Sequence, residues 1–368
     1  MKLFLNTYHY GHRIVSLAKD KECAEDLFKN GLSFLLIYEY RLFLYPEQAE
    51  VCATNEDISL LSRCQNYDVF ELFDDGCLIQ VCDVRSEENI FFITNACNSN
   101  CVMCPSSEKS RRNAYRADIP NLIEIARHMP ANLKHITVTG GEPFLIGKDI
   151  FNLFHFCREK FDTTEFQILT NGRVFAINEY CELVKTYQPL QTTFGIPIHA
   201  ANAALHDEIT QTKGSFIQTV TGIKNLLRIK GKVQLRIVVS KMNYENMAQL
   251  AAFIVQEIPD VYQVCFIAME MTGCAWLNRK DVWIEYGESF QHLEAAIDVI
   301  MRAGIDVTLF NYPLCTVKKP YRTLCAKSIS PDKVRFAQIC DSCVLKDACA
   351  GVFAGTINLE KEYLKPIQ

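Results

Sequence analysis

Apolar and polar positions alternate in two rhythms between residues 89 and 304. Short apolar runs typical of buried strands are each followed by a longer stretch in which apolar residues recur every three to four positions, as in an amphipathic helix. We expect strands at 89–94, 135–139, 165–170, 192–198, 233–239 and 261–269, and helices at 119–129, 149–161, 177–187, 215–231, 246–258 and 289–304. Strands that are each followed by a helix predict a parallel sheet built from right-handed βαβ units.

The segments on either side of this region differ from it. Residues 1–88 carry apolar runs such as "LSFLLIYEY" separated by polar turns, which favours a small α+β or β-rich domain. That domain could bind a leader peptide by strand addition or simply pack against its neighbour, and the aromatic residues of "NTYHYGH" predict core or lid positions. Residues 305–368 are rich in cysteine. We therefore expect three parts, 1–88, 89–304 and 305–368.

The positions of the motifs distinguish an incomplete barrel from an open doubly wound sheet, which periodicity alone does not. In a parallel barrel, functional residues gather at the carboxyl ends of the strands. "CNSNCVMC" follows the first strand, "TGGEPF" the second, "TNG" the third and "IHAANAALHD" the fourth. The expected fold class is therefore α/β, a partial (β/α)6 TIM-type barrel with a small N-terminal domain and a C-terminal cysteine-rich domain.

Composition and charge exclude several classes of protein. The net charge of -5 over 368 residues provides no basic footprint for duplex nucleic acid. The N-terminus lacks the long apolar region of a secretory signal. The most apolar stretch, "LSFLLIYEYRLFLY", is too short to span a bilayer and carries Glu39 and Arg41. We expect a cytoplasmic protein whose partners include neither nucleic acid nor a membrane.

Seventeen cysteines without an export signal do not predict a disulfide scaffold, but three of them cluster after the first strand. Cys97, Cys101 and Cys104 stand at C-x3-C-x2-C. Three thiolates on one loop can hold three corners of a 4Fe-4S cluster and leave the fourth iron open to a non-protein ligand. The alternatives are chance clustering and a zinc site, which usually takes a fourth Cys or His.

A second group of cysteines lies near the end of the sequence. Cys340, Cys343 and Cys349 stand at C-x2-C-x5-C, with Cys315 and Cys325 upstream. Four thiolates would close a cluster completely, which suits electron transfer rather than substrate activation. We expect Cys315 to be the fourth ligand and Cys325 to be its competitor, with a zinc site as the alternative.

Residues 89–310 resemble the radical SAM enzymes. The resemblance rests on "CNSNCVMC", "GGEP", "TNG" and "RIVVSKMN". It implies that S-adenosylmethionine chelates the open iron of a 4Fe-4S cluster through its amino and carboxylate groups. It also implies the following cofactor-binding residues: Met103, Thr139, Gly140, Gly141, Glu142, Pro143, Asn171, His199 and Arg236.

Within this set, the resemblance assigns the methionine amino group to Thr139–Glu142, where the two glycines carry no Cβ to block a close approach. Pro143 would stiffen the turn. Arg236 would pair the carboxylate, and Asn171 and His199 would contact ribose or methionine. From the residues alone, Asn171 could instead be a plain turn residue, His199 a hydrogen-bonded histidine and Arg236 a structural ion-pair partner.

The cysteine-rich tail resembles the SPASM and twitch domains of radical SAM enzymes that modify ribosomal peptides. No cysteine follows Cys349, so one auxiliary 4Fe-4S cluster is expected. The chain is most similar to the C-type radical SAM maturase of the His-Xaa-Ser peptide system. This implies a maturase of the oxidoreductase type that reductively cleaves S-adenosylmethionine to a 5'-deoxyadenosyl radical and cross-links a ribosomally synthesised precursor peptide.

The same resemblance implies an external electron donor such as flavodoxin or ferredoxin, and a second radical SAM maturase as a partner. Alternatives remain at each level. The product could be an epimer, with Cys274 as hydrogen donor. The substrate could be a small or nucleotide-derived molecule. The protein could also be a non-catalytic iron–sulfur or zinc interaction protein, although such a module would not need "GGEP" beside the three-cysteine loop.

Overall fold

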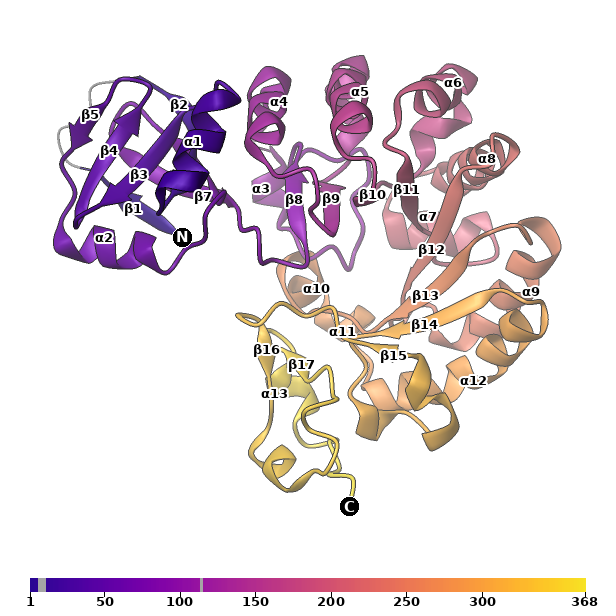
Figure 1. The fold of residues 1–368 in the computed structure, drawn as a ribbon. Coiled ribbons are helices and arrows are strands. Elements are labelled where there is room, and N and C mark those ends of the chain that lie inside the picture. The colour runs from indigo at the N-terminus through magenta and orange to yellow at the C-terminus, as the bar shows by residue number, and fades with distance from the viewer. Residues whose placement is uncertain (6–10, 113–114) are drawn as a thin grey trace.

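The computed structural model describes residues 1–5, 11–112 and 115–368, and Tyr8 and Tyr10, expected in a core or lid, lie outside these ranges. Parallel strands form a central sheet that curls into a half-barrel, in the order β15-β14-β13-β12-β11-β10-β9-β8 (Figure 1). Their bounds are β8 Asn89–Phe92, β9 His135–Thr139, β10 Glu165–Leu169, β11 Gln191–Pro197, β12 Lys232–Val238, β13 Gln263–Ile267, β14 Asp306–Phe310 and β15 Cys325–Ala326.

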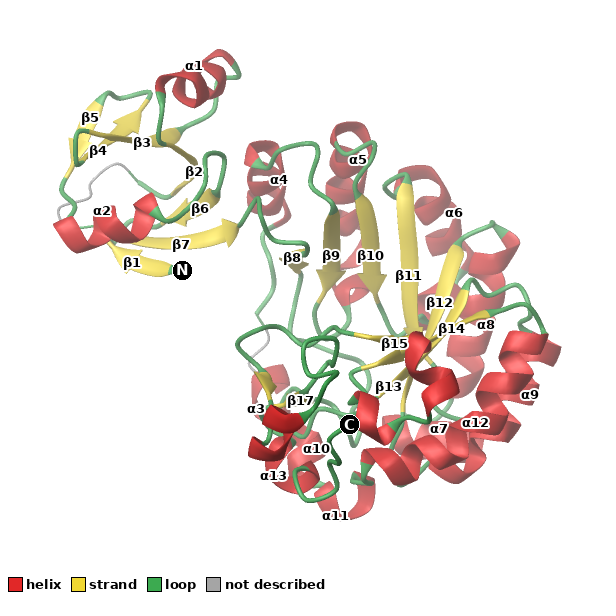
Figure 2. Cartoon of the chain, turned by 60° about the horizontal axis from the view of Figure 1, so that its bottom comes forward, coloured by secondary structure: helices red, strands yellow, loops and turns green. Residues whose placement is uncertain are grey.

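Helices cover the convex outer face of this sheet (Figure 2). They are α4 Ile119–His128, α5 Ile150–Lys160, α6 Asn178–Tyr187, α8 Ser215–Arg228, α9 Met247–Glu257 and α12 Tyr286–Arg302. In α12, Phe290, Leu293 and Ile297 are buried at the spacing of one helical face, so this face packs on the sheet while the opposite face meets solvent. The expected partial barrel, with its strands and helices from 89 to 304, is confirmed.

The sheet continues past the strands expected from the sequence. β14 pairs in parallel with β13, and β15 pairs in parallel with β14, so part of the expected C-terminal segment completes the sheet. Shorter elements connect the large ones. They are α3 Glu108–Arg112, α7 Ala203–Thr210, α10 Gly273–Leu277, α11 Arg279–Val282 and the 3-10 turns η1 Pro143–Asp149, η2 Arg173–Ala176 and η3 Tyr244–Asn246.

The concave inner face of the half-barrel is partly polar. The amide of Gln167 donates to Gln234 (2.9 Å), that of Gln234 to Gln263 (2.7 Å) and that of Gln263 to the hydroxyl of Thr308 (3.0 Å). This chain crosses β11 above Gly195, where an added Cβ would stand 2.7 Å from Leu169. The interior of the half-barrel therefore holds oriented hydrogen-bonding groups rather than a purely apolar filling.

The N-terminal segment forms a sheet of the order β1-β7-β6-β2-β3-β4-β5, in which only β2 and β3 run parallel among the described strands. Its elements are β1 Lys2–Phe4, β2 Arg13–Ala18, α1 Lys21–Lys29, β3 Phe34–Tyr38, β4 Arg41–Tyr45, β5 Ala49–Val51, α2 Asn55–Ser62, β6 Val69–Leu72 and β7 Cys77–Cys82. A buried hydrogen bond of 3.0 Å between Ser16 and His128 joins this sheet to α4. The N-terminal sheet thus lies beside the β8 edge of the half-barrel (Figure 1).

The C-terminal segment consists mostly of short turns that lie across the open side of the half-barrel (Figure 1). Its elements are η4 Leu314–Thr316, η5 Lys319–Leu324, β16 Val334–Arg335, η6 Gln338–Ser342, β17 Val352–Phe353 and α13 Ile357–Glu360. The Met271 N–H donates to the Thr356 hydroxyl (3.0 Å), which ties the segment to the loop after β13. Among the described helices, none combines the length and apolar character needed to cross a membrane.

Candidate functional site

The loops that follow β8, β9 and β10 meet at one end of the sheet. The Gly141 N–H donates to the Thr94 carbonyl (2.6 Å), and the Glu142 N–H donates to the Ala96 carbonyl (2.8 Å). These bonds hold the turn after β9 against the start of the cysteine loop. The carboxyl ends of parallel strands are where functional groups collect in such sheets, so the meeting point is the candidate site.

The two glycines of this turn are required by how closely the turn approaches the cysteine loop. A Cβ on Gly140 would stand 2.2 Å from the Thr94 carbonyl oxygen, and a Cβ on Gly141 would stand 2.2 Å from the Ala96 carbonyl oxygen. Both contacts are with backbone, which cannot swing away as a side chain can. The absence of a Cβ at Gly140 and Gly141 therefore lets the turn pack against the cysteine loop, in addition to the close approach of a ligand that the sequence predicted.

Glu142 joins the turn after β9 to the turn after β10. Its carboxylate is only 2% exposed and accepts hydrogen bonds from the Phe144 N–H (3.1 Å), the Thr170 hydroxyl (2.8 Å) and the Asn171 N–H (2.7 Å). Burial raises the pKa of Glu142, and these bonds oppose that rise. Its role at the methionine amino group stays a prediction. Its second role, which the sequence did not indicate, is to join the two turns through these hydrogen bonds.

Arg173 and Asn98 are further residues that the sequence analysis missed. The Arg173 guanidinium donates to the Asn98 carbonyl (2.7 Å) and the Ser99 hydroxyl (3.1 Å), both inside the cysteine loop. The Asn171 amide donates to the Asn98 side chain (2.6 Å). The only sequence signal for Arg173 was its position next to "TNG", which does not indicate the hydrogen-bond partners of its guanidinium. Asn171 therefore contacts the cysteine loop directly, and its predicted contact with ribose or methionine stays a prediction.

The three thiols of the cysteine loop lie close enough to influence one another. Burial raises the pKa of the Cys97 thiol, and burial together with the neighbouring Cys97 and Cys104 thiols raises the pKa of Cys101 to about 12. Among the described residues, no three His, Cys, Asp or Glu side chains converge on a position for a single metal ion. A 4Fe-4S cluster binds its cysteines through separate irons, so its ligands need not converge on one point.

Two further segments hold the cysteine loop in place. The Cys274 N–H, in the loop after β13, donates to the Cys104 carbonyl (2.9 Å), and the Asn278 amide donates to the Val102 carbonyl (2.9 Å). The Arg111 guanidinium lies 3.3 Å from the Cys274 sulfur. Met103 is buried in an apolar cluster with Ile209, Met269 and Met271, so its side chain also anchors the loop.

His199, predicted as a ribose or methionine contact, is buried and neutral. Burial and the neighbouring His206 lower the pKa of His199 to about 3. The two rings stack with their centroids 5.6 Å apart, and the His199 N–H of the backbone donates to His206 Nδ1 (3.2 Å). His199 Nδ1 has no hydrogen-bond partner within the described ranges. A buried ring nitrogen without a partner is compatible with the predicted ligand contact.

Arg236, predicted to pair a carboxylate, projects from β12 into the half-barrel. Its guanidinium donates to the Gln234 amide oxygen (2.9 Å) and lies over the Phe310 ring at 5.5 Å. Burial lowers the pKa of Arg236, but an arginine remains charged at neutral pH. The contacts of the described residues give it no ion pair. A cation in this position would suit an anionic ligand, and the predicted pairing of Arg236 with the carboxylate stays a prediction.

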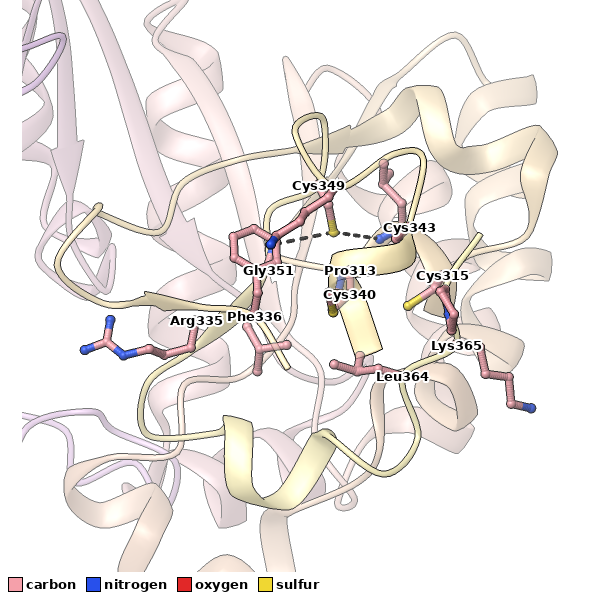
Figure 3. A pocket seen from close by; sticks show the side chains of 14 residues that line it. Pro313, Cys315, Arg335, Phe336, Cys340, Cys343, Cys349, Gly351, Leu364 and Lys365 are labelled. Atoms are coloured by element: carbon pink, nitrogen blue, oxygen red, sulfur yellow. Dashed lines mark hydrogen bonds between the residues drawn. The ribbon is translucent and has the colours of Figure 1, made fainter. Parts of the chain in front are cut away.

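The C-terminal cysteines separate into two groups. Cys315, Cys340, Cys343 and Cys349 line one pocket, whose wall is mostly apolar (Figure 3). Cys325 lies in β15 and is not among the lining residues. This arrangement favours the predicted Cys315 over its competitor as the fourth ligand, and the ligand set itself stays a prediction.

We expect Cys315→Ser to lose the C-terminal cluster and Cys325→Ser to keep it, because only the first removes a thiolate from the pocket. Iron and sulfide analysis after anaerobic reconstitution measures the difference. Cys325→Ser is the matched control, since it replaces the same atom a short distance away in the chain. Cluster loss in that variant, with Cys315 dispensable, contradicts the assignment.

The half-barrel places the three-cysteine loop and the glycine turn against each other at the carboxyl ends of its first strands. Residues 91–254 match the model of the Radical SAM superfamily, so this part of the chain is a radical SAM domain. The cysteine loop, the glycine turn and Arg236 lie within the matched region.

Curated relatives and solved structures resemble this chain over part of its length. The antilisterial bacteriocin subtilosin biosynthesis protein AlbA of Bacillus subtilis (strain 168) is 28% identical over 194 residues, which cover 48% of this chain and 42% of AlbA. SuiB of Streptococcus suis bound to S-adenosylmethionine has a TM-score of 0.49 and 17% identity over 61% of this chain and 50% of SuiB. SuiB bound to its precursor peptide SuiA has a TM-score of 0.49 and 15% identity over 62% and 49%. The chain spans about half the length of the relatives it matches.

Proposed function

We propose that this protein is a radical SAM enzyme that modifies a ribosomally synthesised peptide. The observation that carries the proposal is the contact between the cysteine loop and the "GGEP" turn, where Gly141 and Glu142 donate to the carbonyls of Thr94 and Ala96. A protein that merely bound a metal would not need this turn against its ligand loop. Residues 91–254 belong to a superfamily defined by that chemistry.

The residues present fit the implied cofactors. Cys97, Cys101 and Cys104 would hold three irons of a 4Fe-4S cluster. Gly140 and Gly141 are only partly buried and carry no Cβ, and Arg236 presents a half-buried guanidinium without a carboxylate partner in the described chain. When bound, the cluster and S-adenosylmethionine supply a 5'-deoxyadenosyl radical for hydrogen-atom abstraction.

The chain's own residues orient these groups and restrict their motion. Glu142 and Arg173 cross-connect the loops after β8, β9 and β10, so the cysteine loop has its position before any cofactor binds. Preorganisation of this kind lowers the entropy lost on binding and keeps the reacting atoms correctly oriented. The Arg236 guanidinium, oriented by Gln234, would bind the methionine carboxylate.

The proposed substrate is a precursor peptide and the proposed product a cross-link. Subtilosin biosynthesis is named as the role of AlbA, and SuiB was solved with a precursor peptide. A second cluster at Cys315, Cys340, Cys343 and Cys349 would accept the electron released when a new bond forms, which suits an oxidative outcome. An external electron donor such as flavodoxin or ferredoxin and a second maturase are the proposed protein partners.

Epimerisation is the alternative outcome, and the position of one cysteine supports it. The Cys274 thiol lies beside the cysteine loop, because its backbone N–H bonds to the Cys104 carbonyl. A thiol there is placed near the site where a substrate radical would form and could return a hydrogen atom to it. The two outcomes differ in mass, so one experiment separates them.

We expect a precursor peptide with His-Xaa-Ser repeats to lose two hydrogens when co-expressed with this protein, because bond formation removes one hydrogen from each partner atom. Mass spectrometry of the peptide, with and without growth in deuterated water, measures the outcome. The Cys97→Ala, Cys101→Ala, Cys104→Ala variant is the control. Unchanged mass with deuterium uptake indicates epimerisation, and an unaltered peptide during active cofactor turnover contradicts a peptide substrate.

A further inference from the structure

The segment Leu364–Ile367 closes over the pocket of the C-terminal cysteines. Leu364 is 4% exposed and belongs to the core of the half-barrel, which anchors one end of the segment. At the other end, the Val344 N–H donates to the Ile367 carbonyl (3.0 Å). Leu364, Lys365 and Pro366 line the same pocket as the four thiols (Figure 3). The segment is therefore held in place against the cysteines at both ends.

One backbone N–H of this segment points at a cysteine sulfur. The Ile367 N–H donates to the Cys343 sulfur at 3.4 Å. Pro366, which precedes this donor, has no N–H to leave unpaired, and it favours an extended backbone at Lys365.

Two more backbone donors reach the sulfur of Cys349. The Leu314 N–H lies 3.4 Å from it and the Gly351 N–H lies 3.5 Å from it (Figure 3). Gly351 has a φ of 68°, a left-handed conformation that glycine adopts without strain, so the chain can turn back toward the sulfur there. Two of the four thiols that line the pocket, Cys343 and Cys349, consequently receive hydrogen bonds from the backbone.

Hydrogen bonds to a thiolate sulfur withdraw negative charge from the metal centre. They stabilise the reduced state of a cluster more than the oxidised state, because the reduced state carries one more negative charge. An apolar surrounding strengthens each such bond. We propose that Ile367, Leu314 and Gly351 are positioning residues whose N–H groups raise the reduction potential of an iron–sulfur cluster in this pocket. The inference rests on the proposed C-terminal cluster and adds how its potential is set.

The test removes one donor without changing a ligand. The full chain carrying Cys97→Ala, Cys101→Ala and Cys104→Ala supplies the background, so that any remaining cluster signal comes from the C-terminal site. In it, Ile367→Pro deletes the N–H that faces Cys343, and Ile367→Val keeps it. Lys365→Met keeps the Ile367 N–H but removes a nearby charge, which separates the effect of the hydrogen bond from that of the charge.

The midpoint potential is measured by a redox titration followed by electron paramagnetic resonance, with iron content determined in parallel. We expect Ile367→Pro to shift the potential to more negative values than Ile367→Val and Lys365→Met, which should both match the background. Ile367→Pro with a full cluster and an unshifted potential overturns the inference. If Ile367→Pro weakens iron binding instead, a loss of roughly 10–100-fold relative to Ile367→Val supports it, as expected for a lost outer hydrogen bond to a metal ligand.

A background protein that holds zinc or no metal in this pocket overturns the proposed cluster and the inference together. A redox-active cluster whose midpoint potential is unchanged in Ile367→Pro overturns only the inference and leaves the proposed cluster standing. The metal analysis of the background therefore distinguishes the two failures before any substitution at residue 367 is compared.

Discussion

Replacing Cys97, Cys101 and Cys104 together by alanine is expected to abolish cleavage of S-adenosylmethionine and to halve the iron content, from about eight to about four atoms per chain. The three thiols lie on one loop after β8, where burial and, after it, the neighbouring thiols raise the pKa of Cys101. Without them the loop offers the cluster no ligand, while the C-terminal pocket is untouched. Iron and sulfide analysis and the yield of 5'-deoxyadenosine under reducing conditions measure the two effects.

Cys52→Ser is the control for this experiment, because Cys52 is an exposed cysteine of the N-terminal sheet region, remote from both groups of ligands. It should keep full iron and full cleavage. Retention of both clusters by the triple variant contradicts the ligand assignment. Loss of all iron would instead indicate that the two sites depend on each other for folding.

Gly141→Ala is expected to destabilise the protein by roughly 2–4 kcal/mol and to weaken S-adenosylmethionine binding, because the new Cβ would stand 2.2 Å from the Ala96 carbonyl oxygen. Relief of that contact must lengthen the bonds from Gly141 to Thr94 and from Glu142 to Ala96. The turn would then no longer hold the cysteine loop. Denaturant unfolding and calorimetric binding of S-adenosylmethionine to the reconstituted protein measure the change.

Gly287→Ala is the matched control. Gly287 lies in the first turn of α12, where the nearest atom to a new Cβ is the end of the Glu285 side chain at 3.0 Å. That atom can move, so the change in the free energy of unfolding should stay below about 1 kcal/mol. Equal stability and equal cofactor binding in the two alanine variants would show that the approach of the glycine turn to the cysteine loop is not needed.

The strands and helices from 89 to 304 were predictable because each depends on its own run of residues. Apolar spacing within 4 to 17 residues decides whether a segment buries one helical face or both faces of a strand. β14 and β15 were not predicted, since each is short and lies in a region whose cysteines suggested a separate domain. They form strands because β13 offers an edge to β14 and β14 in turn offers an edge to β15, which is a property of the assembled sheet.

The roles within the site divide in the same way. The spacing of the cysteines and the adjacent glycines are local features, so the sequence alone was enough to predict their place in the site. The partners of Glu142 are not local, because Thr170 and Asn171 come from the next strand end and meet Glu142 only when the sheet forms. Arg173 is a similar case, since its contact with Asn98 spans two loops.

By itself, the sequence determined the succession of βα units, the three-cysteine loop and the glycine turn beside it, because spacing along one chain is enough for each. Only the tertiary structure decided that Cys315 rather than Cys325 lines the C-terminal pocket, that Glu142 accepts hydrogen bonds from Thr170 and Asn171, and that Ile367 points its N–H at the Cys343 sulfur. The physical reason is that hydrogen bonds and metal ligation require atoms to lie within a few ångströms of one another. Distance in space between residues far apart in the chain is set by how the whole sheet curls and packs, which no short pattern contains.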